Sequence, residues 1–158
     1  MATRADNTQI LEETVLCEIT DIKRSRRQAW ARDDLLRKAS DGGKYGERDA
    51  IEAAALAQLV RILGYEDAVI AWRSVKQKVV AMQAGAQVDV VYDMTTKEAA
   101  VASEDVQVAA FARRGNPMRL VQLGDVITKV RAAFARVHDS KRARERARAR
   151  ATAARRRP

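Results

Sequence analysis

The sequence predicts an α+β fold that is mainly helical, and three patterns support this prediction. Apolar residues recur three and four positions apart in several segments before residue 84, as on the buried faces of helices. After Gly85 apolar residues alternate with polar ones, which is typical of a strand. Beyond residue 138 Ala and Arg dominate, and both residue types favour helix. With 158 residues, the chain has room for one domain or two small ones.

Four helices are expected in the first half, each from an apolar stripe, and they span residues 9–22, 25–37, 47–63 and 65–82. The stripe of the first helix is interrupted at Thr20–Asp21, where Asp is a suitable turn residue. Ser25 and Gln28 have the spacing of a capping box at the start of the second helix. Gly64 supplies a stop for the third helix. The segment 38–44 contains paired glycines, which accept the backbone angles of a tight turn.

The second half is expected to form a small β-β-α-β-α unit. Its expected elements are strands at 88–92, 98–102 and 118–122, a helix at 104–113 and a last helix from Gly124. Ser103 is a suitable N-cap for the helix at 104–113. The last helix can continue into the Ala- and Arg-rich tail, so the tail is helical or disordered.

The composition favours an aliphatic core and no catalytic site. The chain is 47% hydrophobic but only 4% aromatic, so Ala, Val, Leu and Ile must fill most of the core, together with Trp72. Cys17 and His138 are the only residues of their types and lie far apart in sequence. Gly42–Gly43 lacks the Lys-Ser/Thr that follows in a phosphate-binding loop. No enzymatic activity, cofactor or metal site is therefore expected.

Positive charge is concentrated in two segments. The formal net charge is +9, and residues 139–158 alone carry nine basic and two acidic residues, a net charge of +7. Residues 23–48 carry nine basic and four acidic residues, a net charge of +5. Such segments suit a polyanionic partner. The cluster from Lys23 to Gln28 would begin a helix, where free backbone N–H groups and the helix dipole also attract phosphates.

The run from Leu16 to Leu36 (LCEITDIKRSRRQAWARDDLL) resembles the opening of the MerR family of regulators, which has an apolar helix, a Gly-Val-Ser turn and a recognition helix. GKYGERD at 43–49 resembles the family's wing and the Arg-Tyr-x-x-x-Asp that leads into its third helix. Leu59 to Tyr65 is similar to the Leu-Gly-Phe junction before its fourth helix. The resemblance covers about residues 12–80. It implies a winged helix-turn-helix that binds double-stranded DNA.

Three positions depart from the family pattern. Asp21 stands where the family turn has glycine, and Lys23 stands where it has an N-capping serine. Arg27 occupies a position that is apolar and buried in the family. The metal-binding cysteines of the family are absent, so metal sensing is not implied.

The candidate DNA-binding residues follow from the charge and from the resemblance. In the N-terminal module, residues 9–84, they are Lys23, Arg24, Arg26, Arg27, Gln28, Lys44 and Arg48. In the tail they are Lys141, Arg142, Arg144, Arg146, Arg148 and Arg150. The expected divisions are a DNA-binding domain at 9–84, a dimerisation, effector or protein-partner unit at 87–138, and a tail at 139–158.

These observations predict a sequence-specific DNA-binding protein, a transcriptional regulator that forms a homodimer, because one short recognition helix reads only a few base pairs. Two alternatives stay open: a phage or chromosome-associated packaging protein that neutralises nucleic acid without reading it, and an RNA-binding accessory protein. The tail also suits an acidic protein partner, or solvent alone.

The first seven residues lack the apolar segment of a secretory signal, and no apolar run is long enough to cross a bilayer. A cytoplasmic, nucleoid-associated protein without membrane contact is expected.

Overall fold

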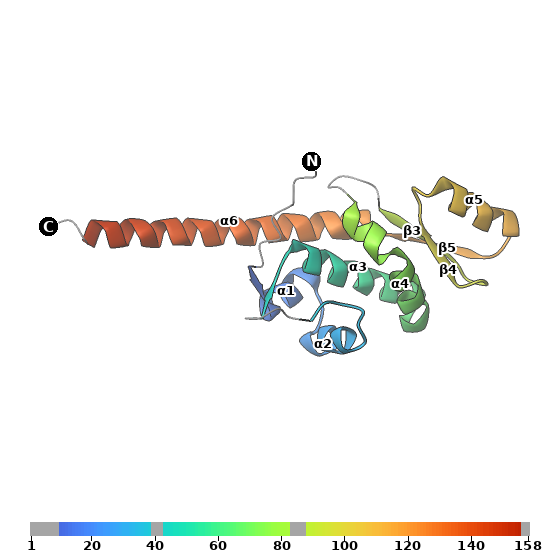
Figure 1. Cartoon of the computed structure of the whole chain (residues 1–158), viewed down its shortest axis with the longest axis horizontal. Helices are drawn as coiled ribbons and strands as arrows, with labels where there is room; N and C mark the ends of the chain where they lie inside the picture. The colour runs from blue at the N-terminus through green and yellow to red at the C-terminus, as the bar shows by residue number, and fades with distance from the viewer. Residues whose placement is uncertain (1–9, 39–42, 83–87, 156–158) are drawn as a thin grey trace.

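The computed structural model describes residues 10–38, 43–82 and 88–155, and it shows the predicted α+β class with helices dominating (Figure 1). The first half contains β1 (Leu11–Glu12), α1 (Glu13–Thr20), α2 (Arg24–Arg32), β2 (Lys44–Tyr45), α3 (Glu47–Leu63) and α4 (Tyr65–Ala81). The second half contains β3 (Asp89–Asp93), β4 (Glu98–Val101), α5 (Asp105–Arg114), β5 (Met118–Gln122) and α6 (Gly124–Arg155). The predicted starting residue Gln9 and the predicted unit boundary at 84–87 lie outside the described residues.

The first predicted helix is wrong at its start. Leu11 and Glu12 form β1, which pairs antiparallel with β2 in the register Leu11 to Tyr45 and Glu12 to Lys44. Leu11 is fully buried, so the apolar residue that suggested a helical face serves the sheet and the core instead. The helix begins only at Glu13.

The second predicted helix is wrong at both ends. Lys23 is the N-cap residue of α2 and makes no side-chain cap, so Ser25 lies inside the helix and does not begin it. The helix ends at Arg32 because Asp34 adopts a left-handed conformation with φ of 56°. Leu35 and Leu36 are buried in the core, but they lie in the turn that follows α2 and not in the helix.

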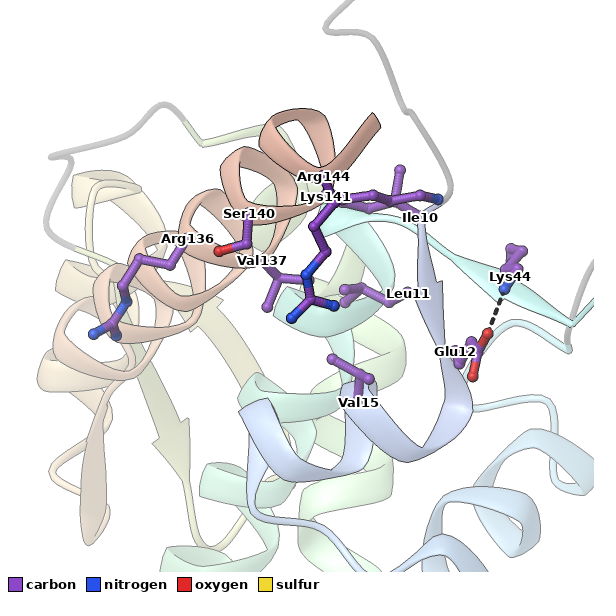
Figure 2. Close-up of a pocket in the computed structure, with 10 residues that line it drawn as sticks. All are labelled: Ile10, Leu11, Glu12, Val15, Lys44, Arg136, Val137, Ser140, Lys141 and Arg144. Atoms are coloured by element: carbon purple, nitrogen blue, oxygen red, sulfur yellow. Dashed lines mark hydrogen bonds and ion pairs between the residues drawn. The ribbon is translucent and has the colours of Figure 1, made fainter. Parts of the chain in front are cut away.

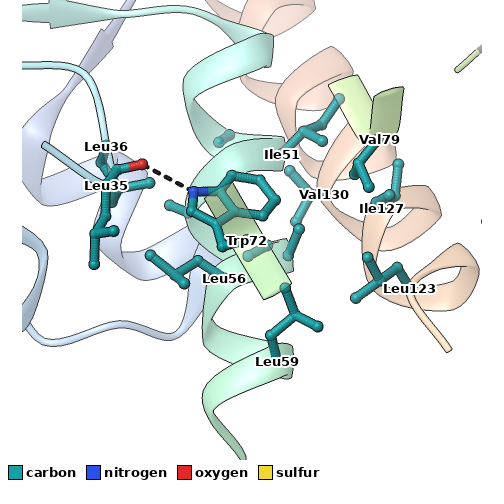
Figure 3. Packing of buried hydrophobic residues seen from close by; sticks show 14 of the residues in the cluster. Leu35, Leu36, Ile51, Leu56, Leu59, Trp72, Val79, Leu123, Ile127 and Val130 are labelled. Carbon is teal, nitrogen blue, oxygen red and sulfur yellow. Dashed lines mark hydrogen bonds between the residues drawn. The ribbon is translucent and has the colours of Figure 1, made fainter. Parts of the chain in front are cut away.

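α3 and α4 form the centre of the core, and α3 has the predicted bounds. Gly64 joins them with φ of 83°, a conformation that favours glycine. Trp72 is fully buried, as expected, and Leu59 is fully buried as well (Figure 3). The indole N–H of Trp72 donates to the carbonyl of Leu35 over 2.9 Å, which ties the turn after α2 to α4.

The three strands of the second half form an antiparallel sheet in the order β4-β3-β5. The predicted strands and helices are all present, with ends shifted by about one residue at most. The predicted N-cap is wrong, because Glu104 rather than Ser103 precedes α5. The Glu104 carboxylate accepts the N–H of Val101 over 3.0 Å and pairs with Lys78, so it joins the end of β4 to α4.

α6 is a single helix of 32 residues that contains both the end of the second unit and the tail. Its first half contributes Ile127 and Val130 to the same buried cluster as Leu11 and Leu59 (Figure 3). Its second half projects away from the rest of the molecule (Figure 1). Of the two tail conformations expected, helix and disorder, the structure has the helix as far as Arg155.

Candidate nucleic-acid interface

α1 and α2 are joined by three residues, and the turn depends on Asp21. This residue adopts a left-handed conformation with φ of 54° and ψ of 43°, which Asp tolerates better than most side chains. The N–H of Ile22 then donates to the carbonyl of Cys17 over 3.1 Å, and the buried Ile22 side chain anchors the turn. Asp21 is therefore the residue of this turn that adopts a positive φ.

The first turn of α2 is a cationic surface. Lys23, Arg24, Ser25 and Arg26 are all exposed, and this end of the helix also carries free backbone N–H groups. Arg26 takes part in no ion pair within the described part of the chain. This arrangement presents the N-terminal end of α2 to an anion such as a phosphate.

The Glu13 carboxylate of α1 holds three of the predicted contact residues. Its Oε2 accepts from Arg24 Nε over 2.5 Å and from Gln28 Nε2 over 3.2 Å. Its Oε1 accepts from Arg27 Nη1 over 3.1 Å. Glu13 thereby fixes the direction of these side chains and neutralises part of their charge. This cluster could not be predicted from the sequence, because its partners are 11 to 15 residues apart and lie on different helices.

Arg27 is a structural residue, and its predicted role as a DNA contact is wrong for this fold. Its side chain is only 4% exposed. The guanidinium lies 4.1 Å from the centre of the Tyr45 ring and donates from Nη2 to the carbonyl of Arg37 over 2.9 Å. Its Nε has no hydrogen-bond partner among the described residues. Arg27 therefore links α1, α2 and β2.

Arg27→Met is expected to lower the free energy of unfolding by about 2–4 kcal/mol, because the buried contacts to Glu13, Tyr45 and Arg37 are lost together. Arg26→Met is the matched control on the same helix turn and should change stability by less than about 0.5 kcal/mol. Urea denaturation of both variants measures the difference. Equal stability of the two variants would contradict the structural role of Arg27.

Lys44 and Arg48 are also paired with carboxylates. Lys44 Nζ lies 2.8 Å from Glu12 Oε1 across the β1–β2 pair, and the proximity of Lys44 lowers the pKa of Glu12. Arg48 Nε lies 3.0 Å from Oε1 of the buried Glu52, whose Oε2 binds Lys76 Nζ over 3.1 Å. Lys44 and Arg48 keep 38% and 49% of their side chains exposed, so a phosphate can still reach them.

Arg37, which was not among the candidates, fixes the junction between β2 and α3. Its Nε and Nη2 each donate to one oxygen of Asp49 over 2.8 Å, and these hydrogen bonds to the carboxylate raise the pKa of Arg37. Asp49 also accepts the N–H of Gly46 over 2.7 Å, which caps α3. The sequence contained a signal for the capping role of Asp49, because an acidic residue in the first turn is typical of a helix start.

The six candidate residues of the tail are exposed along the second half of α6. Figure 2 shows where this half begins, at a hollow of about 510 Å³ beside β1 and α1. Leu11, Val15 and Val137 supply its apolar wall, and Lys141 and Arg144 lie at its edge together with Lys44. The structure thus brings the base of the tail next to β2, while the tip of the tail extends away from the fold.

The two groups of candidates differ in their electrostatic state. Arg24, Lys44 and Arg48 are each paired with a carboxylate. The six tail cations from Lys141 to Arg150 form no ion pair within the described part of the chain. Uncompensated charge attracts a polyanion more strongly than paired charge. Within the described residues, the tail therefore offers six unpaired cations to a polyanion, whereas the N-terminal group offers Lys23 and Arg26.

The described residues contain no group of three or more His, Cys, Asp or Glu side chains placed to hold a metal ion. None of the helices in these residues combines the length and the apolar character needed to cross a membrane. Comparison with models of known protein families finds no match, and comparison with curated protein sequences finds none either.

Proposed function

We propose that this chain is a sequence-specific DNA-binding protein that acts as a transcriptional regulator in the cytoplasm, bound to the nucleoid. α1, the three-residue turn and α2 would form a helix-turn-helix, with β1 and β2 as the wing beside it. α2 would read the major groove, and the tail would bind phosphates. No enzymatic step is proposed.

The observation that carries this proposal is the exposed cationic first turn of α2, with Arg26 and Gln28 at the surface. Arg pairs with guanine and Gln with adenine at the edges that the major groove displays. The geometry of the turn supports the same function. The helix starts after Lys23, where the resembled family has its N-capping serine, and Asp21 adopts the conformation that the family's glycine permits.

A homodimer is part of this proposal, since two recognition helices double the length of DNA that is read. Residues 87–138 would supply the contact, or would bind an effector or another protein. A second function is favoured by the unpaired tail cations: packaging of nucleic acid without sequence recognition. The following prediction separates the two functions.

Arg26→Ala and Gln28→Ala are each expected to weaken binding to a preferred site by about 1–3 kcal/mol and to leave binding to scrambled DNA nearly unchanged. The preferred site is obtained by selecting bound sequences from random DNA with the full-length protein. Arg32→Ala is the matched control, because Arg32 is exposed at the other end of α2.

Titration of each variant against selected and scrambled duplexes decides the matter. Equal losses on both duplexes would mean that Arg26 and Gln28 contact only phosphates. Selection that returns no preferred sequence would contradict the regulator and support the packaging function.

A further inference from the structure

The second half of α6 is a helical arm that continues from the part of α6 packed on the core. Val130 is buried in the core, and Phe134 and Val137 pack against it, so the helix is anchored as it leaves the fold. From Lys141 to Arg155 it continues for roughly 21 Å without glycine or proline. Every side chain from 139 to 154 is exposed. Among the described residues, only the base of the arm, at Lys141 and Arg144, borders the hollow beside β1 and α1.

The cations of the arm fall on two opposite flanks. Two residues along a helix correspond to a rotation of about 200°, and four residues to about 40°. Arginines two residues apart therefore point to opposite sides of the helix, and arginines four residues apart point to nearly the same side. One flank carries Lys141, Arg144 and Arg148, and the other carries Arg142, Arg146 and Arg150.

The two remaining sides of the arm differ from each other. Ala143, Ala147 and Ala151 follow one another at four-residue steps, on the side midway between the two cationic flanks. Glu145, the one acidic residue after Asp139, lies on the opposite side near Ala149. The arm thus has a narrow apolar edge, two cationic flanks and an outer edge with an acid.

This distribution fits a groove better than a single strand of phosphates. A helix that lies along one backbone uses the cations of one flank and directs the others to solvent. The major groove of B-DNA is about 12 Å wide, which accepts a helix of about 10–12 Å diameter between two rows of phosphates. An alanine edge lets the helix approach the groove floor closely, and the acid then faces away from the DNA.

We propose that the arm from Lys141 to Arg155 inserts lengthwise into the major groove of double-stranded DNA, with its alanine edge toward the bases and its flanks on the two phosphate strands. This binding mode rests on the proposed DNA-binding function but not on sequence recognition by α2. It would give the protein a second groove contact that does not depend on α2.

Two triple variants of the full-length chain test the use of both flanks: Lys141→Gln/Arg144→Gln/Arg148→Gln and Arg142→Gln/Arg146→Gln/Arg150→Gln. Each removes three charges, so their long-range effects match. On a random-sequence duplex, each should reduce the slope of log affinity against log salt by about 2 to 3. A reduced slope for only one variant would place the arm on a single backbone and overturn the proposal.

The two triple variants would also reduce the slope equally if the tail bound DNA as a loosely attached cationic chain. A second pair of variants separates this case from groove insertion. Ala147→Trp enlarges the alanine edge, and Ala149→Trp makes the same change on the outer edge. Insertion predicts that Ala147→Trp weakens duplex binding about tenfold or more, whereas Ala149→Trp leaves it nearly unchanged. Circular dichroism checks that both variants keep their helix content.

Equal affinities of the two tryptophan variants would overturn the insertion. Tighter binding of an RNA duplex than of a DNA duplex would overturn it as well, since the A-form major groove is too narrow for the arm. These measurements use random-sequence duplexes, so they test the arm and not sequence recognition by α2. The proposed function is contradicted by a different result, which is a selection experiment that returns no preferred DNA sequence.

Discussion

Removal of residues 139–158 is expected to weaken binding to every DNA duplex by a factor on the order of 10⁵ near 0.1 M salt. Each neutralised phosphate releases counterions and contributes about 0.9 to the slope of log affinity against log salt, so contacts by the six cations from Lys141 to Arg150 account for this loss. Binding isotherms of the full-length and truncated chains at several salt concentrations measure both quantities. The truncated chain should show a visibly shallower slope.

The size of this effect follows from the pairing of charges in the rest of the structure. Glu13 holds Arg24, Glu12 holds Lys44 and Glu52 holds Arg48, so these cations must exchange one anion for another when they bind a phosphate. The six cations from Lys141 to Arg150 form no ion pair within the described residues and make no such exchange. The N-terminal module is therefore expected to supply selectivity, and the tail most of the affinity.

A variant with Gln at the six tail positions from Lys141 to Arg150 is the matched control for truncation, because Gln keeps the helix propensity and removes the charge. It should reproduce the loss of affinity and leave the preferred site unchanged, since phosphate contacts carry no direct sequence information. An unchanged salt slope in both proteins would assign the tail to a protein partner or to solvent. A changed site preference would place base recognition in the tail.

The long elements of this fold could be predicted because their apolar patterns extend over many residues. α3 contains a stripe of four to five turns, and its glycine stop is where the sequence suggested. Met118–Gln122 was likewise predicted with its observed bounds. In such segments local propensity and burial favour the same structure, so tertiary contacts do not change the outcome.

The short elements could not be predicted, since their conformation depends on residues that are distant in sequence. β1 has only two residues and forms through its pairing with β2, more than thirty positions later. The end of α2 depends on the left-handed Asp34 and on the bond between Trp72 and the carbonyl of Leu35. A local apolar pattern contains no information on either contact.

Candidate residues could be named from their type and charge, but their contacts could not. Arg26 and the six tail cations from Lys141 to Arg150 are exposed. Arg27 has the same charge as its neighbours but lies beneath them, against Tyr45. A charge run shows where cations are numerous, and only the three-dimensional fold shows which of them are neutralised, as Arg24 is by Glu13.

Leu59→Ala is expected to lower the free energy of unfolding by about 2–5 kcal/mol, because it removes a fully buried side chain and leaves a cavity in the core. Leu59 belongs to a buried cluster that includes Leu16 of α1, Val90 of β3 and Val130 of α6. Both predicted units contribute to this cluster. The loss should therefore destabilise the whole folded chain in one transition rather than only its N-terminal part.

Leu120→Ala is the matched control, since it makes the same change at a leucine that is 54% exposed on β5. It should change stability by no more than about 0.5 kcal/mol. Fluorescence of Trp30 and Trp72 reports on the first half, and far-UV circular dichroism reports on all helices, including α6. For Leu59→Ala the two signals should shift to the same lower urea concentration, because the shared core couples the elements that they report on. Separate transitions would show that the two units unfold independently, and an unchanged stability would contradict the burial of Leu59 between α3, α4 and the second half of the chain.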